Sequence, residues 1–147
     1  MQNKFQVFSD KIDVNLLKNN LLNSEVGAYV SFEGLVRNHN DGKEVLQLEY
    51  EIYEKMSIKE AEKILIEAKK NFDLVDFLCV HRKGLLQIGD IAVYVGVTAF
   101  HRGAAFQACE YIINQIKVRL PIWKKEYYVN GSAEWVNCQE CLKHSPL

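Results

Sequence analysis

The sequence has few of the features that mark disordered, fibrous or disulfide-stapled proteins. It contains only two prolines and four cysteines in 147 residues, while 48% of the residues are hydrophobic and 25% are charged. Such a composition is ordinary for a globular chain, and a domain of this size buries roughly 70% of the surface of its unfolded chain. We therefore expect a folded protein with a hydrophobic core of its own.

The chain also has little net charge and no long apolar run. The formal net charge is -1, so the chain has no overall positive field for nucleic acid or anionic membranes, and any anion site must be local. No run approaches the roughly 18 to 20 apolar residues of a membrane-spanning helix, and Met1 to Asp10 lack the apolar core of a signal peptide. These absences predict a cytoplasmic protein.

The four cysteines are unevenly spaced, which makes disulfides a weak expectation. Cys79 lies in an apolar run and Cys109 on a helical pattern, so we expect small buried side chains and assign neither a catalytic role. Cys138, Cys141 and His144 have the spacing of metal ligands, but three ligands do not complete a tetrahedral zinc site. We therefore predict no metal and a frayed terminus.

Apolar residues recur at helical spacing in three segments. They predict helices over residues 14–22, residues 57–72 and about residues 103–119. Asp13 can cap the first helix, and Ser57 followed by Glu60 has the pattern of a capping box at the start of the second. Pro121 prevents the third helix from continuing.

Alternating apolar and polar residues predict strands near residue 5 and over residues 26–37, 45–52, 74–81, 91–98, 123–129 and 133–136. The polar turn from Asn38 to Gly42 indicates a hairpin with a long loop between residues 26–37 and 45–52. Asn130-Gly131 indicates a second, C-terminal hairpin. The two apolar strands over 74–81 and 91–98 are expected to pair at the centre of the sheet.

Mixed strands and helices with short turns favour an α+β fold over a doubly wound one. We predict a mostly antiparallel sheet with two or three helices packed on it, plus the C-terminal β-hairpin. The sequence has no repeat, linker or low-complexity tract. We therefore expect a single domain over residues 1–136 and a poorly ordered tail over residues 137–147.

Lys117 and Lys124 flank the break at Pro121, and the turn can bring their ammonium groups close. Such a pair can bind a phosphate, and each charge lowers the pKa of the other, which prepares one lysine for proton transfer or nucleophilic attack. The alternative is that both lysines are simply solvated, because lysines at helix ends complement the helix dipole and usually face water.

Basic residues also lie at three predicted strand ends, twice as a His-Arg pair and once as a single arginine. His101 and Arg102 precede a helix, whose N–H groups and positive dipole end favour an anion. His101 could shuttle a proton, or it could only satisfy a backbone group. Arg37 ends another strand. His81-Arg82 also ends a strand, but a turn follows, so we interpret this pair as structural.

Three stretches taken together resemble the signature motifs of the molybdopterin synthase large subunit family. They are Phe32-Glu33-Gly34-Leu35-Val36-Arg37-Asn38-His39, Gly96-Val97-Thr98-Ala99-Phe100-His101-Arg102 and Lys117-Val118-Arg119-Leu120-Pro121-Ile122-Trp123-Lys124-Lys125-Glu126. The stretches agree with the family in order and spacing, and the similarity covers roughly residues 26–136. The resemblance implies the family's α/β-hammerhead-type fold.

The resemblance also implies a sulfur transfer onto cyclic pyranopterin monophosphate that forms the dithiolene of molybdopterin. The sulfur would come from a thiocarboxylate on the C-terminal glycine of a small ubiquitin-like partner, so neither a reactive cysteine nor a cofactor is implied. By motif match, Lys117 and Lys124 would be catalytic, while Arg37, His101 and Arg102 would bind the substrate. The family's large subunit forms a homodimer within a heterotetramer, so both copies would line one site.

Cations suit this reaction, because negative charge develops on phosphate and oxygen. The residues leave two other functions open. A phosphoesterase or phosphotransferase using His101 would need a nucleophile or metal-binding carboxylates, and the sequence has no acidic cluster of that kind. A non-catalytic subunit would only dock a partner's extended C-terminal tail on a sheet edge, and Lys117 and Lys124 would then be dispensable.

Overall fold

The computed structural model describes residues 4–137. Its elements are β1 (Phe5–Phe8), α1 (Val14–Leu21), β2 (Ala28–Leu35), β3 (His39–Asn40), β4 (Lys43–Ile52), α2 (Glu54–Asn71), β5 (Leu74–Arg82), β6 (Gly84–Gln87), β7 (Ile91–Ala99), α3 (Arg102–Arg119), β8 (Ile122–Tyr128) and β9 (Ala133–Asn137). Apart from the parallel pair of β1 and β5, the paired strands of the described residues run antiparallel. The predicted α+β fold is confirmed.

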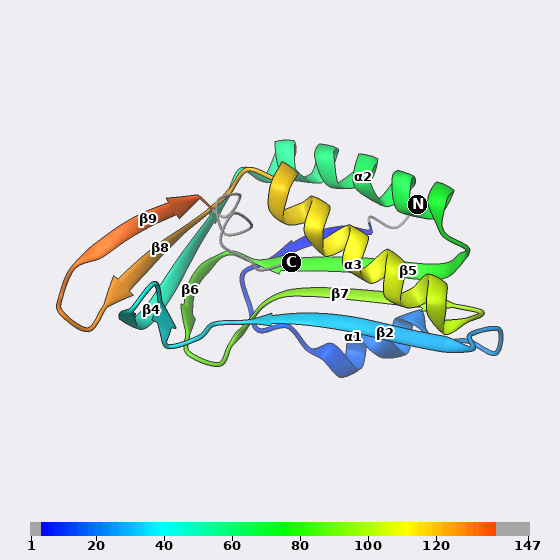
Figure 1. Ribbon diagram of the computed structural model, residues 1–147, viewed down its shortest axis with the longest axis horizontal. Coiled ribbons are helices and arrows are strands. Elements are labelled where there is room, and N and C mark those ends of the chain that lie inside the picture. Colours follow the sequence, from blue (N-terminus) through cyan, green and yellow to red (C-terminus); the bar gives the residue numbers. More distant parts are fainter. Residues whose placement is uncertain (1–3, 138–147) are drawn as a thin grey trace.

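The first sheet has the strand order β1-β5-β7-β2. Helices α2 and α3 cover one face of this sheet and α1 covers the other (Figure 1). The central position predicted for β5 and β7 is confirmed, and both strands are apolar because both of their faces are covered by helices. No helix within residues 4–137 is long and apolar enough to cross a membrane.

The larger core lies between this sheet and helices α2 and α3. Small side chains on α3, including Ala105 and Ala108, let the helix approach the sheet closely, and Ile112 and Ile116 fill the space next to them. Cys79 and Cys109 are buried, as predicted, and burial raises the pKa of the Cys109 thiol to about 11. Both thiols are therefore part of the packing and are not poised as thiolates. The buried side chains of this core are Phe5, Ile52, Ala61, Ile64, Leu65, Ala68, Cys79, Val93, Val95, Val97, Ala99, Ala105, Ala108, Cys109, Ile112, Ile113, Ile116, Leu120 and Ile122.

The second sheet has the strand order β3-β4-β8-β9. Strand β6 also pairs with β4, on the side of β4 away from β8. The predicted hairpin between residues 26–37 and 45–52 is wrong, because β2 pairs with β7 while β4 pairs with β6 and β8. Most of their apolar side chains lie in different clusters, although Ile52 at the end of β4 reaches the larger core. Val30 and Phe32 of β2 pack on the α3 side of the first sheet, whereas Val45 and Leu48 of β4 pack in a separate cluster.

The predicted start of the second helix is also wrong. Helix α2 begins at Glu54, with Tyr53 as its N-cap residue, and Ser57 lies one turn inside it with its backbone N–H bonded to the Tyr53 carbonyl at 2.9 Å. An acidic side chain in the first turn favours this earlier start, because it complements the helix dipole. The predicted Asp13 cap is confirmed, since its carboxylate accepts a hydrogen bond of 3.2 Å from the N–H of Leu16.

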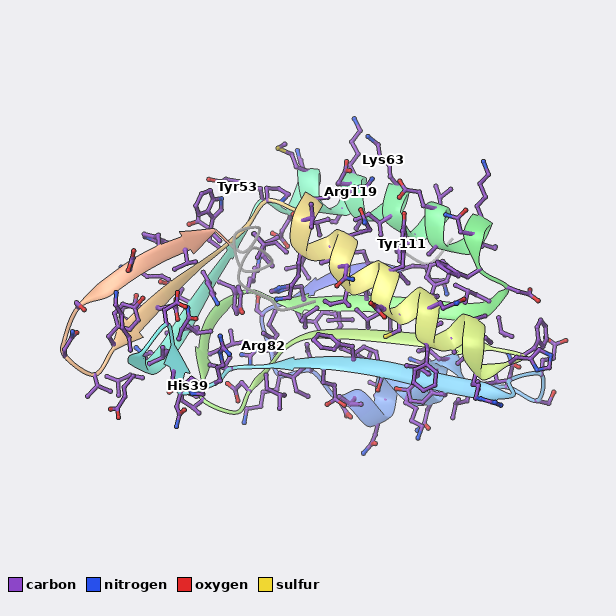
Figure 2. The ribbon with its side chains drawn as sticks, viewed as in Figure 1. His39, Tyr53, Lys63, Arg82, Tyr111 and Arg119 are labelled. Carbon is purple, nitrogen blue, oxygen red and sulfur yellow. The ribbon has the colours of Figure 1, made fainter. Side chains whose placement is uncertain are left out.

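Glu60 takes part in a link between helices instead of a cap. Arg119 at the end of α3 donates from Nε to Glu60 at 2.8 Å and from its terminal nitrogens to both carboxylate oxygens of Glu67 at 2.7 and 3.1 Å. Tyr111 donates a further bond of 2.6 Å to Glu67. These bonds lower the pKa of Glu67 to about 2. Figure 2 shows Arg119 and Tyr111 on α3 beside α2.

The C-terminal hairpin predicted from Asn130-Gly131 is confirmed as β8 and β9. Gly131 has a φ of 89°, a left-handed value that suits glycine, and the Asn130 side chain accepts a bond of 2.9 Å from the N–H of Ser132. The predicted tail began at Asn137, yet Asn137 is the last residue of β9 and pairs with Trp123. Cys138, Cys141 and His144 lie outside the described residues.

Candidate active site

A cavity of about 250 Å³ lies where the two sheets meet under the C-terminal end of α3. Residues from both sheets, from α3 and from the segment around β3 form its wall. The lining residues are Gly34, Leu35, Arg37, His39, Asn40, Leu48, Tyr50, His81, Ala92, Val93, Ile113, Ile116, Lys117, Ile122, Lys124 and Glu126.

Three of the predicted site residues line this cavity. Arg37 follows β2, Lys117 lies in the last turn of α3, and Lys124 lies in β8 directly opposite Tyr50 of β4. The break at Pro121 turns the chain between the two lysines, as the sequence predicted. Both lysines are half-buried, so their charges act in a region partly shielded from water.

An acidic group shares the cavity with these cations. Glu126 is only 2% exposed, and its carboxylate accepts a hydrogen bond of 2.8 Å from the side-chain amide of Asn40. The oxygen of the same amide accepts a bond of 3.2 Å from Arg37. Glu126 lies on the face of β8 that carries Lys124, because side chains two residues apart point the same way. This spacing could have predicted Glu126, whereas nothing in the sequence indicated the bridging role of Asn40.

His81 also reaches the cavity wall, although its sequence position had indicated a structural role. Its Nδ1 donates a bond of 2.8 Å to the carbonyl of Arg82, which leaves Nε2 as the nitrogen with a lone pair. Burial lowers the pKa of His81 to about 4 against the opposing effect of that bond, and the charge of Lys117 lowers it further. The ring also packs edge-on against Tyr50, with centroids 5.0 Å apart. At neutral pH this side chain is therefore an uncharged hydrogen-bond acceptor.

Arg82, the neighbour of His81, points away from the cavity and is buried. Its guanidinium lies 3.4 Å from the carboxylate of Asp90, which also accepts a bond of 2.9 Å from the N–H of Gln87. This contact ties the end of β5 to the turn before β7. Arg82 therefore fits the structural interpretation.

His101 and Arg102 lie far from the cavity. His101 is the N-cap residue of α3 and Arg102 is its first residue, while Lys117 lies fifteen residues further along the same helix. At 1.5 Å per residue this spacing is about 22 Å, longer than any side chain can bridge. Both residues are exposed. One copy of the chain therefore brings together Arg37, Lys117 and Lys124 but leaves His101 and Arg102 at the opposite end of the helix.

The cavity is suited to a compact anionic ligand. Three cations line it, a guanidinium can hold a phosphate through two parallel hydrogen bonds, and two ammonium groups can stabilise negative charge that develops nearby. His81 adds an uncharged acceptor, and Glu126 adds a carboxylate that can hold a donor group of the ligand or of a neighbouring side chain. The arrangement can therefore bind a phosphate and stabilise a charged transition state.

The family model described as MoaE protein matches residues 7–119 of this chain. The chain belongs to the MoaE family. A relative from Thermoplasma volcanium, named molybdopterin synthase catalytic subunit, is 39% identical over 92% of this chain and 99% of its own length. The family resemblance seen in the three sequence motifs is thus confirmed, and this MoaE chain is an enzyme subunit of molybdopterin synthesis.

Solved structures agree with this assignment. The crystal structure of molybdopterin synthase from Staphylococcus aureus matches with a TM-score of 0.85 and 35% identity, covering 92% of this chain and 98% of that one. A Helicobacter pylori complex of subunits 1 and 2 of molybdopterin-converting factor matches with a TM-score of 0.74. It is 23% identical and covers 92% of this chain and 90% of that one, so it supports the fold alone.

Proposed function

We propose that this MoaE chain transfers sulfur to cyclic pyranopterin monophosphate and so forms the dithiolene of molybdopterin. The sulfur donor is the C-terminal thiocarboxylate of a small ubiquitin-like subunit. The observation that carries the proposal is the meeting of Arg37, Lys117 and Lys124, from three separate segments of the chain, at one cavity. A substrate with a phosphate and a reaction that develops negative charge both require such a cluster.

Lys117 and Lys124 are the proposed catalytic residues. Their ammonium groups stabilise charge on phosphate and oxygen as the cyclic phosphate opens and sulfur adds to the neighbouring carbons, and one of them can donate and accept a proton in turn. Arg37 binds the substrate phosphate. Neither thiol of the core is needed, because the sulfur arrives with the partner.

His101 and Arg102 are proposed to act in the cavity of a second copy. Within one chain about 22 Å of helix separates Arg102 from Lys117, so these residues reach a cavity only across a homodimer. Both side chains are exposed and available for such a contact. The complete assembly is then a heterotetramer with two large and two small subunits, located in the cytoplasm. The two-subunit complex from Helicobacter pylori is consistent with a partner of this kind.

Reconstitution tests the proposal. The purified chain is incubated with cyclic pyranopterin monophosphate and a thiocarboxylated small subunit, and the dithiolene product is measured as its oxidised fluorescent derivative. Lys117→Ala and Lys124→Ala should each abolish product while the small subunit still binds. Lys125→Ala is the matched control, because Lys125 lies on the opposite face of β8, with its ammonium group over the rings of Tyr127 and Trp135.

The competing proposal is a subunit that only docks the partner's tail. It predicts full partner binding, no product from the wild-type chain, and no effect of either lysine substitution.

A separate experiment tests only the role proposed for His101 and Arg102 in the cavity of a second copy. Mixed dimers of Arg102→Ala and Lys117→Ala chains should regain part of the activity if the two residues serve one cavity from different copies. Mixed dimers without activity would reject the proposal that Arg102 and Lys117 serve one cavity from different copies.

A further inference from the structure

Asn40 stands between the guanidinium of Arg37 and the buried carboxylate of Glu126. Its amide oxygen accepts from Arg37 at 3.2 Å and its amide nitrogen donates to Glu126 at 2.8 Å. An uncharged amide therefore contacts both charged groups at once, with the donor on the acidic side and the acceptor on the basic side. The ion pairs described for residues 4–137 include none between Arg37 and Glu126.

This separation is unexpected from electrostatics alone. A guanidinium and a largely buried carboxylate in one cavity attract each other, and arginine forms bidentate pairs with carboxylates as readily as with phosphates. Arg37 is exposed and has a long, flexible side chain, so it could swing onto Glu126. A direct pair would neutralise the cation that the substrate phosphate needs.

We propose that Asn40 is a positioning residue that keeps Arg37 from pairing with Glu126 and so leaves the guanidinium available to the substrate phosphate. The inference rests on the proposed role of Arg37 in binding that phosphate. Asn40 occupies one N–H group of Arg37, and the guanidinium has four other N–H groups for a phosphate. At the same time Asn40 supplies Glu126 with the hydrogen bond that a buried carboxylate requires.

The backbone around Asn40 holds its side chain in this place. Asn40 ends the short strand β3 and pairs with Lys43 at the start of β4. The two residues between them, Asp41 and Gly42, have φ values of 48° and 77°, as in the tight turns that join antiparallel strands. Because this turn sets the position of Asn40, its amide is fixed opposite β8 before any ligand binds.

The test is a double-mutant cycle with Asn40→Ala and Glu126→Gln. The affinity for cyclic pyranopterin monophosphate is measured by calorimetry, with the full chain and its small subunit. Asn40→Ala should weaken binding at least tenfold, with a smaller effect on the turnover of bound substrate, because Arg37 then pairs with Glu126. Adding Glu126→Gln should reverse the effect, since a neutral amide does not trap the guanidinium. The double variant should bind within about threefold of Glu126→Gln alone.

A purely structural role for Asn40 predicts a different result. The double variant would then lose at least as much affinity as the two single variants combined, and this outcome would overturn the proposal. Arg37→Ala separates the inference from the proposed function. If Arg37→Ala binds substrate normally, the role of Arg37 itself is rejected. If Arg37→Ala weakens binding and Asn40→Ala does not, only the role of Asn40 is rejected.

Asn40→Asp provides a second variant in case Asn40→Ala does not fold. It keeps the shape of the side chain but introduces a carboxylate that holds Arg37 directly. The proposal therefore predicts a similar loss of affinity, this time without recovery on adding Glu126→Gln. Recovery of Asn40→Asp by that second substitution would contradict it.

Discussion

Acid should destabilise this fold between pH 6.5 and pH 4, and His81 should cause most of the loss. Burial lowers the pKa of His81 to about 4 from an ordinary value of 6.5. Between these values the unfolded chain binds a proton at this residue and the folded chain does not, so the free energy of unfolding falls as the pH falls. A difference of about 2.5 pKa units, at about 1.36 kcal/mol each, corresponds to about 3 kcal/mol.

A second acid transition should lie lower. Hydrogen bonds from Arg119 and Tyr111 lower the pKa of Glu67 to about 2 from 4.5. This carboxylate therefore contributes stability above pH 4.5 that is lost as the pH falls toward 2. Because the two ranges scarcely overlap, the effect of His81 can be measured above pH 4.5 without interference from Glu67.

The assay is urea unfolding followed by circular dichroism at pH 7.0 and pH 4.5. The wild-type chain should lose about 2 kcal/mol between these conditions, the larger part of the full effect. His81→Gln, which does not titrate, should remove most of this difference whatever its own stability. His101→Gln is the matched control at an exposed position and should leave the difference unchanged. An equal pH dependence in the wild type and in His81→Gln would show that His81 does not cause the loss of stability.

Three further predictions concern packing and the helix link. Gly96→Ala should destabilise the fold by about 1–3 kcal/mol in urea unfolding, because the added Cβ would overlap the Tyr94 hydroxyl. Gly103→Ala is the control: its added Cβ would lie in open space, so this substitution should not lower stability. Ile112→Ala should cost about 2–5 kcal/mol in the same assay, because the side chain is fully buried between α3 and the first sheet. Arg119→Gln should lower the thermal midpoint, and the difference from wild type should shrink at high salt if the link to α2 is electrostatic.

The predicted functional residues divide into those that local sequence could place and those that it could not. Lys117 and Lys124 are close in sequence, and the proline between them breaks the helix, so their meeting at one cavity followed from local rules. Arg37 is far from both in sequence, and its role was suggested by a family resemblance. The bridging position of Asn40 depends on β8 lying opposite the β3 turn, a contact between residues 86 positions apart.

Local sequence signals placed most of the helices and strands, because hydrophobic periodicity, the Asp13 cap, Pro121 and the Asn130-Gly131 turn act over a few neighbouring residues. They missed the short strands β3 and β6 and the first residues of α2. The pairing of the strands depended on contacts between residues that are distant in the sequence. β2 and β4 have the same alternating pattern and a suitable turn between them, but Val30 and Phe32 of β2 pack on the α3 side of the first sheet, whereas Val45 and Leu48 of β4 pack in a separate cluster. That pairing produces two sheets, with the cavity where they meet. The distance of about 22 Å between Arg102 and Lys117 follows instead from the length of the continuous helix α3.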